Sequence, residues 1–350
     1  QLVIAAGLLG MARVDPVADL ALVAWFALLV AFGSATQDIT IDAYRIEAMD
    51  PEFQGAMAAA YVLGYRIALL VAGAGAFYLA EGASWQVAYV VMAVLMAGGI
   101  LTTLALREPD HAAAAAARAL EARVEEALGA TSRRGPFGRT LAFLSDAVVA
   151  PFVDFFARNG REALLILLLI SLYKLSDITM GVMANPFYLD LGFSKTDIAD
   201  VTKIFGFFMT IAGAALGGVL VVRFGIARPL VLGAVLVALT NLLFAGLAVL
   251  EPSLALLAVV VSADNLSGGI AAAVFIAYLS SLTNQAYTAT QYALFSSLMT
   301  LPAKVLGGFS GVVVDAQGYM AFFLYAGLLG IPAILLSLRV TRSPVGQPSS

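Results

Sequence analysis

Long apolar blocks, separated by short polar or turn-forming segments, run through most of this sequence. Nine of the ten blocks are long enough to cross about 30 Å of hydrocarbon, which takes roughly 20 residues of helix. The blocks cover residues 1–12, 20–43, 56–80, 85–106, 163–185, 196–222, 228–250, 254–283, 290–314 and 319–338. Acid-proline pairs such as Asp15-Pro16 and Glu251-Pro252 separate them, as expected where helices leave a bilayer. The pattern predicts an all-α membrane protein with about ten transmembrane segments.

The polar stretch 107–162 divides the blocks into a group of four and a group of six. An internal repeat explains this unequal division. Three residues recur 234 positions later: Gly73, Glu81 and Trp85 as Gly307, Asp315 and Tyr319. Two parallel six-helix halves are a common plan among transporters. On this plan Gln1 falls inside the third helix, and we expect two further helices upstream of it.

The plan predicts four regions. An incomplete N-terminal half, with helices three to six, occupies residues 1–106. An inter-half loop with amphipathic helical stretches follows at 107–162, then a C-terminal half at 163–340 and a tail at 341–350. Lys and Arg gather in the loop and in the segments on its side, whereas the other side has only Arg13 and Lys195. The positive-inside rule therefore predicts that the loop and the carboxyl terminus are cytoplasmic.

Composition narrows the chemistry. The chain is 61% hydrophobic and 12% charged, against about 25% charged in ordinary soluble domains. It has no cysteine, and its single histidine, His111, lies in the inter-half loop. Disulfides, thiol nucleophiles and Cys metal sites are excluded, and a Ser-His or zinc-His hydrolase would need a histidine within the bundle. We predict a protein that is not an enzyme and that uses no cofactor, metal or nucleic acid.

Charged residues inside the apolar blocks are the most informative positions. Each costs about 2.5–3.5 kcal/mol near the bilayer centre, so it must face a partner or a polar cavity. They are Asp38, Asp42, Arg66, Lys174, Asp177, Lys203, Asp264 and Lys304. Four acids balance four bases, which permits both ion pairs and a polar path through the protein.

Each of these positions has a structural interpretation beside a functional one. Asp38 and Asp42 share a helix face near the cytoplasmic end, where they could pair with Arg45 or serve as a proton or gating site. Lys174 and Asp177 are three residues apart at mid-span, where an intrahelical pair would also need other polar neighbours.

Other polar and small residues also carry two interpretations. Lys203 could extend to the outer interface or line a cavity. Asp264-Asn265, followed by small residues, could line a cavity or allow close helix packing. Rings that could stack on sugars, or serve as packing and lipid-belt groups, are Tyr61, Tyr65, Tyr173 and Tyr278. The Gly pairs 213/217 and 307/311 are spaced for close helix packing.

Several strings bear a family resemblance. They are Ser34 to Ala43 (SATQDITIDA), Leu63 to Arg66 (LGYR), Val149 to Pro151 with Asp154 to Phe156, Leu172 to Asp177 (LYKLSD), Lys203 with Gly206, Asn265-Leu266 with Gly268-Gly269, and Thr288 to Leu294 (TATQYAL). These strings resemble the AmpG-type muropeptide permeases of the major facilitator superfamily, in register from residue 1 to about 340. Acetyl-coenzyme A transporters look similar around residues 34–43. The family's first two helices are missing here, and the tail Ser343 to Ser350 replaces an extension that some members carry.

The resemblance implies a multi-pass, monomeric symporter in the inner membrane of a Gram-negative bacterium. Its partners would be the lipid bilayer, protons and anhydromuropeptides, which are N-acetylglucosamine linked to 1,6-anhydro-N-acetylmuramic acid with or without a peptide. The alternatives are a transporter of acetyl-coenzyme A or another solute, and a membrane receptor that does not transport.

Roles for individual residues follow from the resemblance together with their chemistry. Lys174 and Lys203 would bind substrate carboxylates, and Asn185, Asn265 and Gln291 would bond its amide and hydroxyl groups. Tyr65 and Arg66 complete the expected substrate-binding set. The candidates for proton coupling or gating are Asp177, Asp38, Asp42 and Asp264.

Overall fold

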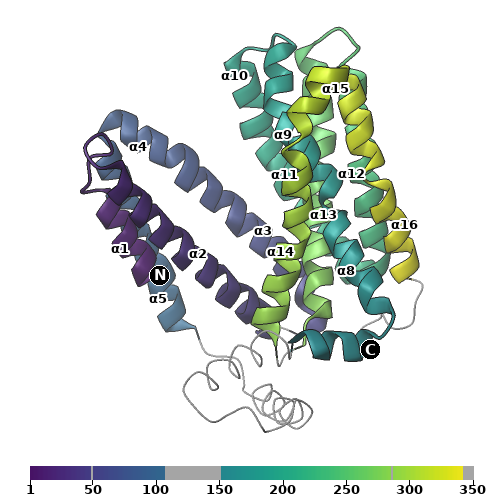
Figure 1. The fold of residues 1–350 in the computed structure, drawn as a ribbon, viewed down its shortest axis with the longest axis horizontal. Coiled ribbons are helices and arrows are strands. Elements are labelled where there is room, and N and C mark those ends of the chain that lie inside the picture. The colour runs from purple at the N-terminus through teal and green to yellow at the C-terminus, as the bar shows by residue number, and fades with distance from the viewer. Residues whose placement is uncertain (49, 107–150, 285–286, 342–350) are drawn as a thin grey trace. The chain divides into compact units, whose positions relative to one another are not determined.

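The structure, a computed structural model, describes residues 1–48, 50–106, 151–284 and 287–341 (Figure 1). The described residues form helices and turns, with no strand among them. They divide into two compact units. Unit 1 consists of Gln1–Ala48 and Gly64–Ala113, and unit 2 of Met49–Leu63 and Ala114–Ser350.

Eight helical spans in the described part are long and apolar enough to cross a membrane. They are Leu20–Glu47, Gln54–Gly82, Trp85–Ala105, Glu162–Asp190, Asp200–Phe224, Ala227–Leu247, Leu254–Leu282 and Ser310–Val340. The prediction of an all-α, multi-pass membrane protein is confirmed. The predicted segment at residues 1–12 is a short helix, Leu2–Met11. The predicted segment at 290–314 is wrong at its end, because the helix there is Thr288–Gly307 and the next helix begins at Ser310. Thr288–Gly307 is not one of the eight spans.

Unit 1 is a small helical bundle. Its elements are α1 (Leu2–Met11), α2 (Leu20–Glu47), the second part of α3 (Gln54–Leu70), the π-helical turn η2 (Val71–Gly75), α4 (Ala76–Gly82) and α5 (Trp85–Ala105). Asp19 and Ser84 cap α2 and α5 by accepting backbone N–H bonds, which explains where these helices begin. α1 packs along α2, with Gly7 so close to Val30 that a larger residue would collide.

Unit 2 is the larger bundle. After η1 (Pro51–Phe53), the first part of α3 and a helix at 151–159, it contains α8 (Glu162–Tyr173), α9 (Leu175–Asp190), α10 (Lys195–Ile198), the π-helical turn η4 (Ala199–Phe205), α11 (Gly206–Phe224), α12 (Ala227–Leu247), α13 (Leu254–Leu282), α14 (Thr288–Gly307), α15 (Ser310–Leu328) and α16 (Ile331–Val340). Its aromatic core joins α9, α12 and α15 through Phe187, Phe244 and Phe323.

Small residues bring α11 and α13 together. A Cβ added to Gly213 would collide with the backbone of Leu266, and one added to Gly217 would lie 2.8 Å from the carbonyl oxygen of Ile270. Gly269 of α13 meets the backbone of α11 in the same way. The packing role predicted for the pair at 213 and 217 is confirmed.

Gly318 in α15 and Pro186 in α9 are residues that a regular helix disfavours. Gly318 has φ +80° and ψ 170°, a conformation that favours glycine, and it divides α15 into two helical pieces. The division falls between the predicted segments 290–314 and 319–338. α9 continues past Pro186 to Asp190, whereas the predicted segment ends at residue 185. Proline removes one backbone hydrogen bond, and a membrane helix tolerates the loss where neighbouring groups compensate.

Candidate functional site

The span formed by α8 and α9 is interrupted near its middle. Lys174 lies at the break, with φ −96° and ψ 0°, a sparsely populated backbone conformation. The preceding residue, Tyr173, is buried, and its hydroxyl donates to the carbonyl oxygen of Leu230 at 3.0 Å. Its ring stacks on Phe275 with centroids 4.1 Å apart. These two contacts anchor the end of α8 and so fix the backbone that presents Lys174.

An ion pair occupies this break. The ammonium nitrogen of Lys174 lies 2.6 Å from a carboxylate oxygen of Asp177, and the two side chains are 16% and 25% exposed. The predicted intrahelical pair is therefore confirmed. An ammonium group has three N–H donors, and Asp177 is the one partner that it meets among the described residues. The pair can consequently accept a further anionic or polar group.

A second carboxylate, that of Asp264 on α13, belongs to the same group of polar side chains inside unit 2, which we call the polar layer. It accepts a 3.3 Å hydrogen bond from Thr240 of α12, and the charges of Asp177 and Lys174 act on it. Asp264 is therefore a second acid close enough to interact with the charges of the Lys174 and Asp177 pair, although the ammonium group contacts only Asp177 among the described residues. The described residues contain no group of three or more His, Asp or Glu side chains that could hold a metal ion.

Buried polar residues of α9 and α12 extend this layer. The amide of Asn241 donates to the hydroxyl of Ser176 at 2.6 Å, and Ser176 donates to the carbonyl oxygen of Ala326 at 2.7 Å. Sequence reasoning missed Asn241, Ser176 and Thr240. The adjacent polar residues Thr240 and Asn241 inside an apolar block were the available signal.

The remaining predicted substrate groups of α9, η4 and α13 differ in their surroundings. Asn265 accepts from Thr210 at 2.8 Å and donates to the carbonyl oxygen of Val261 at 2.9 Å, which leaves half of its hydrogen-bonding capacity unused. Asn185 is exposed on α9. Lys203 lies on η4 by its backbone, and its side chain falls outside the described part of the chain.

Gln291 lies in a different polar cluster, at the start of α14. Its amide nitrogen donates to Asp154 and to the carbonyl oxygen of Pro151, both at 2.9 Å. Its amide oxygen accepts from Arg158 at 3.1 Å and from the backbone of Asn284 at 2.8 Å. All four hydrogen bonds of the side chain are therefore made within the protein. A substrate would have to displace one of these partners to reach Gln291.

Unit 1 contains the other predicted positions. Asp42 lies 3.6 Å from Arg45 and is nearly buried, which matches the structural pairing considered for it. Asp38, one helical turn earlier, is exposed. Tyr65 is 57% exposed, whereas Arg66 is partly buried.

Two of the four predicted stacking rings serve as packing groups in unit 2. Tyr173 and Tyr278 are each only 4% exposed, and both rings lie against Phe275. The packing interpretation is confirmed for these two tyrosines.

Comparison with known proteins places this geometry in a family. The chain is 31% identical over 337 residues to the AmpG 4 protein of Rickettsia felis, covering 96% of this chain and 76% of that protein. It is 34% identical over 340 residues to the anhydromuropeptide permease of Escherichia coli, covering 97% of this chain and 64% of that permease. A search against family models found no match.

The fold also matches a solved transporter. The structure of the proton:xylose symporter XylE, a member of the major facilitator superfamily, superposes with a TM-score of 0.70 at 15% identity, covering 97% of this chain and 78% of that one. This likeness establishes the fold of the major facilitator superfamily. Together with the identity to the Rickettsia protein, it shows that the chain belongs to the AmpG family of membrane transporters.

Proposed function

We propose that this protein imports anhydromuropeptides across the inner membrane of a Gram-negative bacterium, driven by protons. The Escherichia coli relative is named for that substrate, and the match supports it over acetyl-coenzyme A. The observation that carries the proposal is the Lys174 and Asp177 pair at a helix break inside the span. A peptide carboxylate of the substrate can compete with Asp177 for the ammonium group.

Charge balance links this competition to proton binding. In the unloaded site, Lys174 and Asp177 neutralise each other. When a substrate carboxylate takes the ammonium, Asp177 loses its partner and binds a proton, so the loaded site is neutral as well. A site that is neutral in both states avoids the cost of about 2.5–3.5 kcal/mol for an uncompensated charge at mid-membrane. Asp264, Asp38 and Asp42 are the alternative proton carriers.

The remaining groups would bind the rest of the substrate. In this proposal Lys203, Arg66 and Tyr65 contact carboxylates and sugar rings, and Asn185 and Asn265 bond amides and hydroxyls. Asn265 keeps half of its hydrogen-bonding capacity for this purpose. Gln291, expected from the sequence to join Asn185 and Asn265, has no role in this proposal, because all four of its hydrogen bonds are made within the protein. The protein would act as a monomer of two helical halves, residues 1–106 and 163–340, which alternate about the site.

Uptake of labelled anhydromuropeptide by cells that lack their own permease tests the proposal. Accumulation should follow the proton gradient and collapse when an uncoupler is added. Transport of acetyl-coenzyme A in place of muropeptide would refute the substrate assignment. Uptake that resists the uncoupler would refute the proton coupling.

A further inference from the structure

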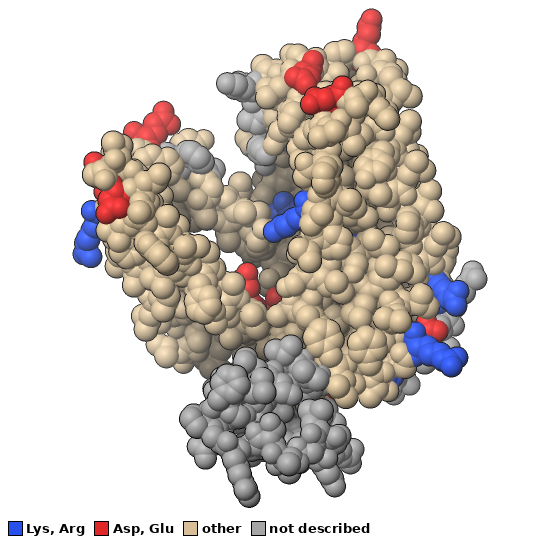
Figure 2. Space-filling model, viewed as in Figure 1, with Lys and Arg blue, Asp and Glu red and all other residues tan. Residues whose placement is uncertain are grey.

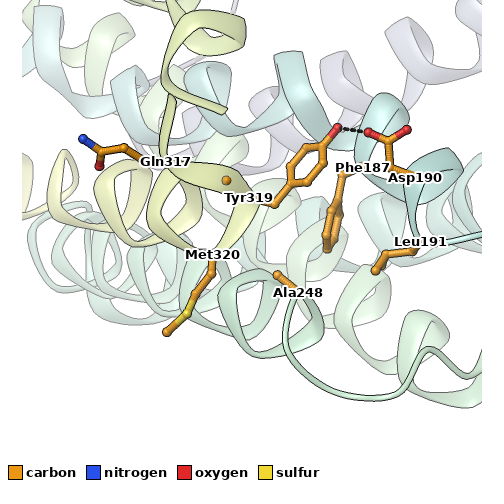
Figure 3. A pocket seen from close by; sticks show the side chains of 8 residues that line it. Phe187, Asp190, Leu191, Ala248, Gln317, Tyr319 and Met320 are labelled. Carbon is orange, nitrogen blue, oxygen red and sulfur yellow. Dashed lines mark hydrogen bonds between the residues drawn. The ribbon is translucent and has the colours of Figure 1, made fainter. Parts of the chain in front are cut away.

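A partly open cavity lies beside the last turn of α9 in unit 2 (Figure 3). Its volume is about 270 Å³, and it forms where α9 and α12 end and where α15 turns at Gly318. Ligand pockets usually have volumes of about 300–1,000 Å³, so this one fits a small group or the end of a larger molecule.

One hydrogen bond organises the cavity. The positive φ of Gly318 divides α15, and the second piece of α15 begins at Tyr319. The hydroxyl of Tyr319 donates to a carboxylate oxygen of Asp190 at 2.6 Å (Figure 3). Asp190 is exposed, and its second carboxylate oxygen has no partner among the described residues. The tyrosine therefore orients a carboxylate that can still accept a hydrogen bond.

The surroundings of this carboxylate are aromatic, apolar and acidic. The ring of Tyr319 lies 4.9 Å from that of the buried Phe187, and Ala248 and Met320 add apolar surface. The charge of Asp315 also acts on Tyr319. No Lys or Arg is among the residues that the structure describes around the cavity. A carboxylate beside an aromatic face, without a competing cation, is suited to an ammonium group on an apolar stem.

We propose that this cavity binds a primary alkylammonium group. Figure 2 supports the charge argument, because acidic side chains gather at this end of unit 2, whereas the visible basic ones lie at mid-height and toward the other end. The cavity lies at the ends of membrane-spanning helices, so an ethanolamine phospholipid in the surrounding bilayer can supply the group. A soluble primary amine is the other source of the same chemistry.

Native mass spectrometry of the purified protein tests the site with defined lipids. The protein should retain phosphatidylethanolamine, which has an ammonium group, more than phosphatidylglycerol, which has none. Asp190→Asn should reduce that retention about threefold, because the carboxylate is exposed and its interactions are screened. Tyr319→Phe keeps the carboxylate and should reduce retention less. Glu251→Gln is the matched control, an exposed acid outside the cavity, and should change nothing.

Thermal unfolding with soluble ethanolamine, in detergent without lipid, separates the two sources. A rise in the unfolding midpoint that Asp190→Asn removes would identify a soluble amine as a ligand, and its absence alongside lipid retention would identify the phospholipid. Equal retention of the two lipids, together with no effect of ethanolamine, would overturn the proposal. Wild-type behaviour of Asp190→Asn in both measurements would overturn it equally.

Discussion

Two polar clusters of unit 2 differ in how much of their hydrogen-bonding capacity they use. Gln291, at the start of α14, makes four hydrogen bonds to protein groups, which is all that its amide can make. Lys174, at mid-span, uses one of its three donors within the described residues. A saturated cluster fixes structure, whereas an unsaturated one keeps capacity for a ligand.

The partners of Gln291 show what the saturated cluster does. Asp154 accepts from Arg158 at 2.9 Å and from Asn284 at 3.0 Å, and Arg158 also donates to the carbonyl oxygen of Leu282. The cluster therefore ties the helix at 151–159 to Leu282 and Asn284 at the end of α13 and to Gln291 at the start of α14. Neutral substitutions should distinguish the two clusters: those in the Lys174 cluster should abolish transport, and those in the Gln291 cluster should lower stability.

The largest effect is expected at Asp177. Asp177→Asn keeps the shape of the side chain but removes the group that exchanges a proton, so gradient-driven accumulation should fall to the uncoupled level. Counterflow, which needs only exchange of loaded carrier, should persist. Normal accumulation in this variant would move the proton role to Asp264, Asp38 or Asp42.

Asp154→Ala tests the saturated cluster. The change leaves Arg158, Asn284 and Gln291 without a shared acceptor, and we expect the free energy of unfolding to fall by about 2–3 kcal/mol. The Michaelis constant of the folded fraction should not change. Arg161→Ala, at an exposed neighbouring site, is the control and should alter stability by less than about 0.5 kcal/mol. A specific loss of substrate affinity in Asp154→Ala would erase the distinction between the clusters.

Lys174→Ala should weaken substrate binding about tenfold, as expected for loss of a charge-assisted bond of about 1.4 kcal/mol. Equilibrium binding of labelled substrate measures this directly. The double variant Lys174→Ala with Asp177→Asn distinguishes a substrate-binding role of the pair from a structural one. If binding returns when both charges are removed, the pair serves only as a structural charge match, because either single change leaves one charge uncompensated.

The smallest effect is expected at Tyr173. Tyr173→Phe removes the hydrogen bond to Leu230 while keeping the stack on Phe275, so stability should fall by about 1 kcal/mol. Substrate affinity should change less than twofold, because the stack still holds the break. Tyr173→Ala removes both contacts, and affinity should then fall further than in Tyr173→Phe. Equal affinities in the two variants would show that the stack does not position Lys174.

Local signals in the sequence predicted much of this architecture. The long apolar blocks predicted the spans, and the three-residue spacing predicted the Lys174 and Asp177 pair. Gly318, where α15 divides, falls in the gap between the predicted segments 290–314 and 319–338. Pairing at this spacing needs only the geometry of one helix, which a sequence carries directly.

Contacts between distant segments could not be predicted in the same way. Gln291 meets Asp154 across 137 residues, and Thr240 meets Asp264 from a different helix. The break at Lys174 has no proline or glycine beside it to announce it. It coincides with the contacts that Tyr173 makes with α12 and α13, which only the folded chain supplies.

The glycine contacts between α11 and α13 have a consequence for motion. Backbones that touch directly leave no flexible side chains between them, so these two helices should move as one rigid body. Bending should then occur where a helix backbone is interrupted: at Lys174 between α8 and α9, at Pro186 in α9 and at Pro302 in α14. Because the chain has no cysteine, spin labels can be placed at chosen sites without a background signal. Label distances within the α11 and α13 pair should stay constant through the transport cycle, while those across the break between α8 and α9 should change.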